Sequence, residues 1–153
     1  MADSPRSYPT RPIVAAAAVV LDEGRVLLIR RKSPPNAGLW TFPGGAVELA
    51  ETVRQCAARE TLEETGVQVE VTSIVEVVDA VFRDDSGCPL YHYVIVDCLA
   101  HPLGGEPRPA SDALEVRWIP IEEALGLDLA RPTGEVLRKA AQLPEEPRNP
   151  RPA

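Results

Sequence analysis

Glu60, Glu63 and Glu64 stand within five consecutive positions near the middle of the 153-residue chain. If this segment is helical, at about 100° per residue, the three side chains fall on one face and point toward the protein body or a cleft in it. Carboxylate oxygens gathered in this way suit hard divalent cations such as Mg²⁺ and Mn²⁺. The spacing therefore predicts a metal site built from three glutamates on one side of a helix.

Without a cation this arrangement is unfavourable. Glu60 and Glu64 are like charges at positions i and i+4, which costs a helix a few tenths of a kcal/mol. They also stand near the helix C-terminus, where the helix dipole destabilises anions by roughly 0.3–1 kcal/mol each. Arg59 can pair with Glu63 at i and i+4 and relieve one charge. A bare acidic run is usually only a solvated helix face, so the assignment to a metal depends on the surrounding residues.

The helix that must position these glutamates has clear boundaries in the sequence. Thr52 and Gln55 match a capping box, with the threonine hydroxyl as N-cap. Gly66 suits the left-handed conformation that ends a helix. We therefore predict a helix over Val53–Thr65. The turn at Pro43–Gly45 just before it allows a close approach of the backbone.

Strand-like segments lie on both sides of this helix. Residues 13–21 and 25–29 are expected to form a hairpin. The other expected elements are strands at 68–82, 91–100 and 115–119, a Gly/Pro loop at 101–111, and closing helices at 121–125 and 133–142. The pattern favours an α/β (α+β) domain with a mixed sheet, and the proline-rich segments 1–11 and 143–153 are expected to be flexible tails.

The composition narrows the class of ligand. Sixteen lysines and arginines against 23 acidic residues give a net charge of −7, which argues against binding a nucleic-acid polymer. The longest apolar run, residues 13–21, is too short to span a bilayer, and no hydrophobic signal region opens the chain. Three cysteines without pairing spacing favour a reducing compartment. We expect a cytoplasmic protein with a small-molecule ligand and no membrane partner, either monomeric or homodimeric.

The segment 45–67 resembles the Nudix box, G-x5-E-x7-R-E-U-x-E-E-x-G-U, where U is apolar. The matching fixed positions are Gly45, Glu51, Arg59, Glu60, Glu63, Glu64 and Gly66. Thr61 departs from the pattern, which has an aliphatic residue there, and we expect a change of packing rather than of chemistry. The resemblance covers residues 12–142 and implies a Nudix-type α/β/α sandwich. It also implies hydrolysis of a nucleoside diphosphate linked to another group X.

The resemblance further implies a role for each residue of the box. Glu60 and Glu64 are implied as the principal ligands of Mg²⁺ (or Mn²⁺ in its place), with the Gly44 carbonyl as a backbone ligand. Glu63 is implied as a third ligand or as the base that positions water. Arg59 is implied to orient a glutamate through an ion pair.

Glu51, at the helix entrance, is expected to complete this group of residues through water or hydrogen bonds. Carboxylates are needed because a pyrophosphate repels hydroxide, so metal ions must neutralise it and lower the pKa of the attacking water. Another carboxylate then takes the proton. The resemblance thus implies Glu63, Glu64 and Arg59 as the catalytic residues. No Ser or Cys nucleophile is required.

Residues that contact the rest of the substrate are less clearly marked. Arg30, in a basic strand end, can touch phosphates or simply be solvated. Tyr91 opens the strand at 91–100 and can stack on a base or pack in the core. Asp112 is expected in the loop position where some Nudix members carry another acidic ligand or base, and Glu115 is the alternative.

The substrate is less defined than the reaction. General sequence character is similar to small bacterial ADP-ribose hydrolases, which implies ADP-ribose or a nucleotide sugar. However, Phe82 and Arg83 stand where an ADP-ribose-type enzyme has a marker proline. A nucleoside triphosphate is the alternative substrate. A Nudix-fold ligand sensor without catalysis is a third reading, and the retained carboxylates argue against it.

Overall fold

The computed structural model describes residues 6–144, so most of the two predicted tails, residues 1–5 and 145–153, lies outside the described part. The elements are β1 (Ile13–Asp22), β2 (Arg25–Arg31), β3 (Trp40–Thr41), β4 (Gly44–Ala46), α1 (Val53–Thr65), β5 (Gln68–Arg83), β6 (Pro89–Gly104), β7 (Ala113–Pro120), α2 (Ile121–Ala124) and α3 (Thr133–Ala141). No helix among the described residues is long and apolar enough to cross a membrane.

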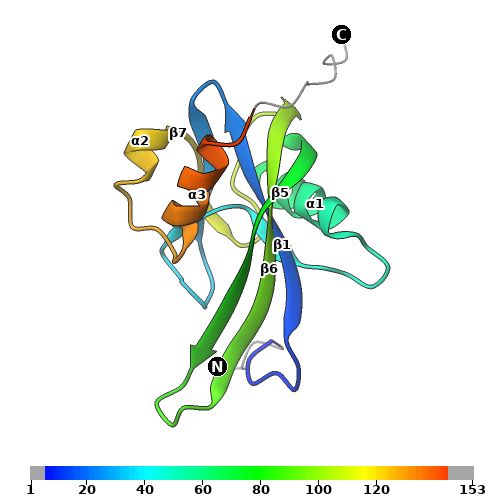
Figure 1. Ribbon diagram of the computed structural model, residues 1–153, viewed down its shortest axis with the longest axis vertical. Helices are drawn as coiled ribbons and strands as arrows, with labels where there is room; N and C mark the ends of the chain where they lie inside the picture. The colour runs from blue at the N-terminus through cyan, green and yellow to red at the C-terminus, as the bar shows by residue number, and fades with distance from the viewer. Residues whose placement is uncertain (1–5, 145–153) are drawn as a thin grey trace.

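The strands form one mixed sheet between helices. Its central order is β3-β2-β1-β6-β5, with β4 added to β1 and β7 added to β2. β1 and β6 run parallel, whereas the other pairs are antiparallel. Figure 1 shows α1 on one side of β1, β5 and β6, and α2 and α3 on the other. This arrangement confirms the predicted α/β/α sandwich with a mixed sheet.

β1 supplies both hydrophobic layers because successive side chains of a strand point to opposite faces. Ala17 and Val19 pack in the cluster that contains Leu137 of α3. Ala16, Ala18 and Val20 belong to the cluster that contains Cys56 and Ala57 of α1. The many alanines keep this central strand thin, so elements on both faces approach the sheet closely.

Helix α1 has the predicted bounds, Val53–Thr65, and the predicted caps. The Thr52 side chain accepts a hydrogen bond from the Gln55 N–H, the Gln55 side chain accepts one from the Thr52 N–H, and Gly66 has φ 76°. Thr61 is fully buried and donates its hydroxyl to the Ala57 carbonyl at 2.7 Å. The residue that departs from the family pattern therefore lies on the buried side of the helix.

The sheet corrects one part of the sequence prediction. Residues 101–104, expected as the start of a loop, continue β6 because β5 runs alongside them. Glu70 pairs with His101 in register, and the Glu70 Oε2 and His101 Nε2 atoms are 3.1 Å apart. A register shift between Gln68 and Val69 accompanies the pairing opposite Pro102. Strand pairing thus extends beyond the point where Pro and Gly residues predicted its end.

Residues 6–11, expected as part of the N-terminal tail, contact the hairpin of β5 and β6. The Tyr8 N–H donates to the Leu90 carbonyl at 2.8 Å, and the Tyr8 hydroxyl donates to Asp84 at 3.0 Å. This hairpin projects beyond the helices (Figure 1). Its projecting end is therefore tied to the segment that precedes β1.

Candidate active site

The site forms where β4 crosses the C-terminal half of α1. β4 pairs with β1, with Gly44 opposite Ala17 and Gly45 opposite Ala16. A Cβ atom on Gly45 would lie 2.6 Å from the carboxyl group of Glu60, and one on Gly44 would lie 2.5 Å from the Ala16 carbonyl oxygen. Both positions therefore need glycine, the first to admit a carboxylate and the second to admit the neighbouring strand.

Glu64 is the most deeply buried acid of the helix, with 2% of its surface exposed. Its Oε1 accepts a hydrogen bond from the Gly44 N–H at 3.0 Å, while its Oε2 is buried with no hydrogen-bond partner in the part of the chain that the structure describes. Burial raises the pKa of Glu64 to about 8, against an ordinary 4.5. A buried carboxylate oxygen without a partner is costly, and a cation would satisfy it.

Arg59 holds the other carboxylates of the site together. Its Nε and Nη2 donate to the two carboxylate oxygens of Glu51 at 2.6 and 2.9 Å. Its Nη1 donates to Glu60 at 2.9 Å and to Glu63 at 3.2 Å, which confirms the pairing expected at i and i+4. The hydrogen bonds from Arg59 lower the pKa of Glu51 to about 2. Glu51 is thus fixed in its charged form at the start of the helix.

The three glutamates of α1 differ in exposure but border the same cavity. The Glu60 side chain is 17% exposed and that of Glu63 is 50% exposed. Within residues 6–144 no three acidic, histidine or cysteine side chains already converge on one point, because Glu60 and Glu63 both turn toward Arg59. The oxygen-only donor set and the unpartnered Glu64 oxygen nevertheless fit a hard divalent cation.

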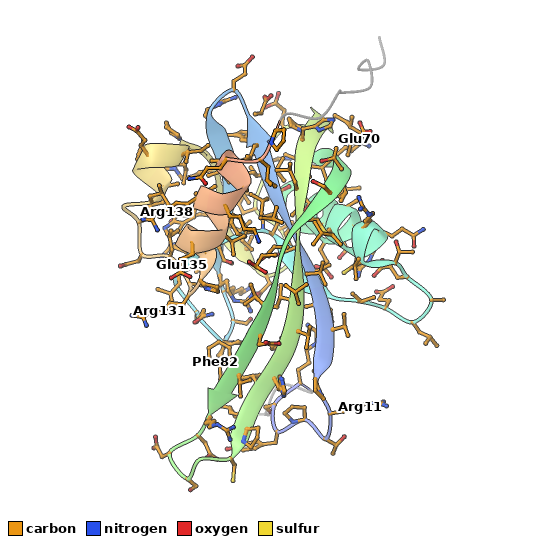
Figure 2. All side chains as sticks on the ribbon, viewed as in Figure 1. Arg11, Glu70, Phe82, Arg131, Glu135 and Arg138 are labelled. Carbon is orange, nitrogen blue, oxygen red and sulfur yellow. The ribbon has the colours of Figure 1, made fainter. Side chains whose placement is uncertain are left out.

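The cavity has a volume of about 470 Å³. Strands β1, β4, β5 and β6, helix α1 and the segment before α3 contribute to its lining. Two of its lining residues are labelled in Figure 2, Phe82 on β5 and Arg131 in the segment before α3. A cavity of this size suits a nucleotide-sized molecule rather than a free phosphate.

The structure brings Arg31, rather than Arg30, to the cavity. Successive strand residues face opposite sides, and Arg30 instead pairs with Glu115 at 2.8 Å. Asp112 does line the cavity and pairs with Arg31 at 3.4 Å. The two acidic alternatives from the sequence are therefore separated, with Asp112 at the cavity and Glu115 bound to an arginine outside its lining.

Tyr91 packs among aromatic residues. Its ring packs edge-on against the Phe82 ring, with the ring centroids 6.3 Å apart. It also stacks on the Tyr93 ring, with the centroids 6.4 Å apart. Phe82 and Tyr93 line the cavity, whereas Tyr91 is not among the lining residues. Of the two alternatives that the sequence left open for Tyr91, the structure therefore favours packing, and the cavity takes its aromatic surface from Phe82 and Tyr93.

Sequence reasoning missed Asp97, which lies in β6 and lines the cavity. It is 5% exposed, and burial, together with the nearby Glu76 charge, raises its pKa to about 7. The signal was present in the sequence as a single acid within the otherwise apolar run Val94–Ala100. Acidic residues are rarely buried without a reason.

We expect the metal-free protein to lose stability as the pH rises from about 4.5 to about 8. Over this window the unfolded chain releases the Glu64 proton while the folded chain retains it, so increasing pH favours unfolding. The loss should be on the order of 3 kcal/mol between pH 5 and pH 8. Urea denaturation in EDTA measures it, and the difference between wild type and Glu64→Gln isolates this group from Asp97. The same pH dependence in both proteins would contradict the assignment.

Comparisons with known proteins agree with this geometry. The NUDIX domain family model matches residues 11–140. An ADP-ribose pyrophosphatase of Methanocaldococcus jannaschii is 35% identical over 70% of this chain, and the match spans 61% of the archaeal protein, less than two thirds of its length. A Mycobacterium tuberculosis protein provisionally named 8-oxo-dGTP diphosphatase 2 is 35% identical over 78% of this chain and 88% of its own length.

A solved structure extends the likeness to three dimensions. The crystal structure of a MutT NUDIX hydrolase from Burkholderia pseudomallei superposes with a TM-score of 0.73 at 34% identity. The match covers 84% of this chain and 98% of the other. The family model matches most of the chain and the fold matches that of a solved NUDIX hydrolase, so the chain belongs to the NUDIX domain family.

Proposed function

We propose that this chain is a metal-dependent hydrolase that cleaves a phosphoanhydride bond in a nucleoside diphosphate linked to another group. The observation that carries the proposal is the unpartnered oxygen of Glu64, buried beside a cavity that Glu60 and Glu63 also line. Gly45, Glu60 and Glu63, three of the fixed residues of the family pattern, line the same cavity as Glu64. The cysteine nearest the site argues against a thiol nucleophile, because burial raises the pKa of Cys56 to about 12.

In this proposal Glu60 and Glu64, with the Gly44 carbonyl, hold the divalent cation, Mg²⁺ or Mn²⁺. When bound, the ion would neutralise phosphate charge and lower the pKa of the attacking water. Glu63 is the more exposed carboxylate and takes the proton from that water or positions it. Arg59 keeps Glu51 ionised and holds Glu60 and Glu63 beside the cavity.

We propose ADP-ribose or a nucleotide sugar as the substrate, acted on in the cytoplasm. The archaeal relative named an ADP-ribose pyrophosphatase supports this choice. A nucleoside triphosphate is the second candidate, supported by the mycobacterial relative whose name refers to 8-oxo-dGTP. Arg31 and Asp112 are the proposed polar contacts for the substrate, and Phe82 and Tyr93 the proposed aromatic ones.

A substrate panel tests the proposal. The full-length protein is incubated with ADP-ribose, nucleotide sugars and nucleoside triphosphates in Mg²⁺ or Mn²⁺, and phosphate released by an added phosphatase is measured. We expect AMP and ribose 5-phosphate from ADP-ribose. A triphosphate should instead give the monophosphate and pyrophosphate. Absence of turnover with every compound and metal would favour a non-catalytic sensor.

The bond that breaks is tested in ¹⁸O-labelled water. The site offers carboxylates for metal ions on one helix face, which suits attack on phosphorus. A glycosidic reaction needs two carboxyl groups on opposite sides of a sugar. We therefore expect the label on a phosphate product, by mass spectrometry. Label on a sugar hydroxyl and on neither phosphate would overturn the proposal.

We expect Mg²⁺ to raise the melting temperature of the wild-type protein. An ion that binds only the folded state, at a concentration one hundred times its Kd, raises the free energy of unfolding by about 2.7 kcal/mol. For a chain of this size, that raises the melting temperature by roughly 5–10 °C. The shift should shrink sharply in the Glu60→Gln, Glu64→Gln double variant, measured by calorimetry. An equal shift in both proteins would place the ion elsewhere.

A further inference from the structure

We propose that Asp97 determines base specificity by hydrogen-bonding the amino-bearing edge of the substrate's nucleobase, with adenine as the preferred base. The inference rests on the proposed nucleotide substrate and deepens it. No residue of the Nudix box takes part in this contact. The proposal assigns a role to a buried acid that the hydrolytic chemistry leaves unused.

The position of Asp97 in the sheet aims its side chain into the cavity. Asp97 pairs in register with Ala17 of β1 and with Glu76 of β5. Paired residues on neighbouring strands share a face, and Ala17 and Asp97 both line the cavity. The short alanine side chain leaves space beside the carboxyl group. Ile95, two residues earlier on the same face, forms an apolar wall next to it.

β1 separates Asp97 from the metal-binding end of the cavity. Gly44, which binds Glu64, pairs with Ala17 on one side of β1, and Asp97 pairs with Ala17 on the other. β4 and β6 are therefore two strand spacings apart, a distance of about 10 Å. A nucleotide carries its phosphates and its base on different sides of the ribose, so phosphates held near Glu64 place the base toward β6.

The Asp97 carboxyl group has no hydrogen bond or ion pair of its own within residues 6–144. Its neighbour in register, Glu76, is itself paired with Lys139 of α3 at 2.9 Å. Asp97 is 5% exposed, and a polar group that is largely removed from water gains from a ligand that hydrogen-bonds to it. Burial is the main cause of the raised pKa of Asp97. A large fraction of its carboxyl groups is therefore neutral near pH 7.

The chemistry of this carboxyl group selects among bases. A neutral carboxylic acid donates one hydrogen bond and accepts another side by side. Adenine presents an exocyclic N–H donor next to a ring nitrogen acceptor, which matches that pair. On the purine edge formed by N7 and the 6-substituent, hypoxanthine carries a carbonyl oxygen in place of the amino group and therefore presents two acceptors and no donor. An asparagine at position 97 would keep one donor and one acceptor, whereas valine would keep neither.

The test measures binding rather than turnover, so that its failure is separate from failure of the hydrolase proposal. The full chain is titrated calorimetrically with AMP and with IMP, in Mg²⁺ and again in EDTA. We expect wild type to favour AMP over IMP about tenfold or more, since a good pair of contacts to a base edge discriminates at that scale. Asp97→Val should lose this preference, and Asp97→Asn should retain most of it.

Two controls separate recognition from a structural role. Asp97→Val removes a buried unpartnered acid, so its melting temperature should stay level or rise, whereas a structural role predicts a fall. Glu122→Gln, the same kind of exchange at an exposed position of α2 outside the cavity, should leave the AMP preference unchanged. The proposal is overturned if wild type binds neither nucleotide or binds both equally, or if Asp97→Val keeps the preference. AMP preference without hydrolysis would instead remove only the proposed activity.

Discussion

Glu64→Gln is expected to lower kcat at least about a hundredfold under saturating Mg²⁺ while the protein still folds. A hundredfold loss corresponds to about 2.7 kcal/mol of transition-state stabilisation. Glutamine keeps the size of the side chain and can keep the hydrogen bond from the Gly44 N–H. It replaces the unpartnered carboxylate oxygen by an uncharged group that holds a cation poorly. Steady-state kinetics with the best substrate of the panel measures the change.

The control for this variant is its stability in EDTA. In the metal-free fold Glu64 is held in its protonated form at a cost in stability at neutral pH. Replacing it by an uncharged amide should therefore leave the melting temperature equal or higher, so lost activity cannot be assigned to unfolding. Glu122→Gln, the same exchange at an exposed position of α2, should keep full activity. Turnover near the wild-type level in Glu64→Gln would sink the assignment of this residue to the metal site.

Gly45→Ala should abolish most of the activity at little cost in stability. The added methyl group would lie 2.6 Å from the Glu60 carboxyl group. That group is the far end of a flexible side chain, so it moves away instead of unfolding the protein. The displaced carboxylate can no longer hold the cation beside Glu64. We expect at least about a tenfold loss of Mg²⁺ affinity by calorimetry and a comparable loss of kcat/KM.

Gly44→Ala is the matched comparison. Its methyl group would meet the Ala16 carbonyl oxygen at 2.5 Å and the Ala17 Cα at 2.7 Å, both backbone atoms of the central strand. These atoms cannot yield, so the variant should lose stability and melt at least several degrees lower. If Gly45→Ala destabilises as much as Gly44→Ala, or binds Mg²⁺ normally, the proposed contact with Glu60 is wrong.

The parts of the molecule that sequence analysis predicted are those whose signals are local. The capping residues Thr52 and Gln55 and the terminal Gly66 define α1 within fifteen residues, and all three have the predicted roles. The pairing of Arg59 with Glu63 also follows from helix geometry alone. These features are therefore predictable from a short segment of the sequence alone.

The parts that sequence analysis missed depend on distant segments. The dominant partner of Arg59 is Glu51, outside the helix, which no helical periodicity predicts. Asp97 reaches the cavity only because β6 lies parallel to β1, with each residue paired to one eighty positions earlier in the chain. The same holds for residues 101–104, where pairing with β5 extends the strand. Arg31 was passed over for Arg30 because the direction of a strand side chain is not readable without the sheet.

The alanines of β1 have a consequence for how this protein can change over generations. Ala15 and Ala17 line the cavity from the strand opposite β4, and larger side chains there would reshape the space without displacing any carboxylate of α1. Single substitutions at these positions can therefore change which molecule binds and leave the residues for bond cleavage unchanged. Two relatives that are each 35% identical to this chain have names that refer to different nucleotides. A difference of this kind is possible where a strand shapes the binding cavity and a separate helix carries the carboxylates.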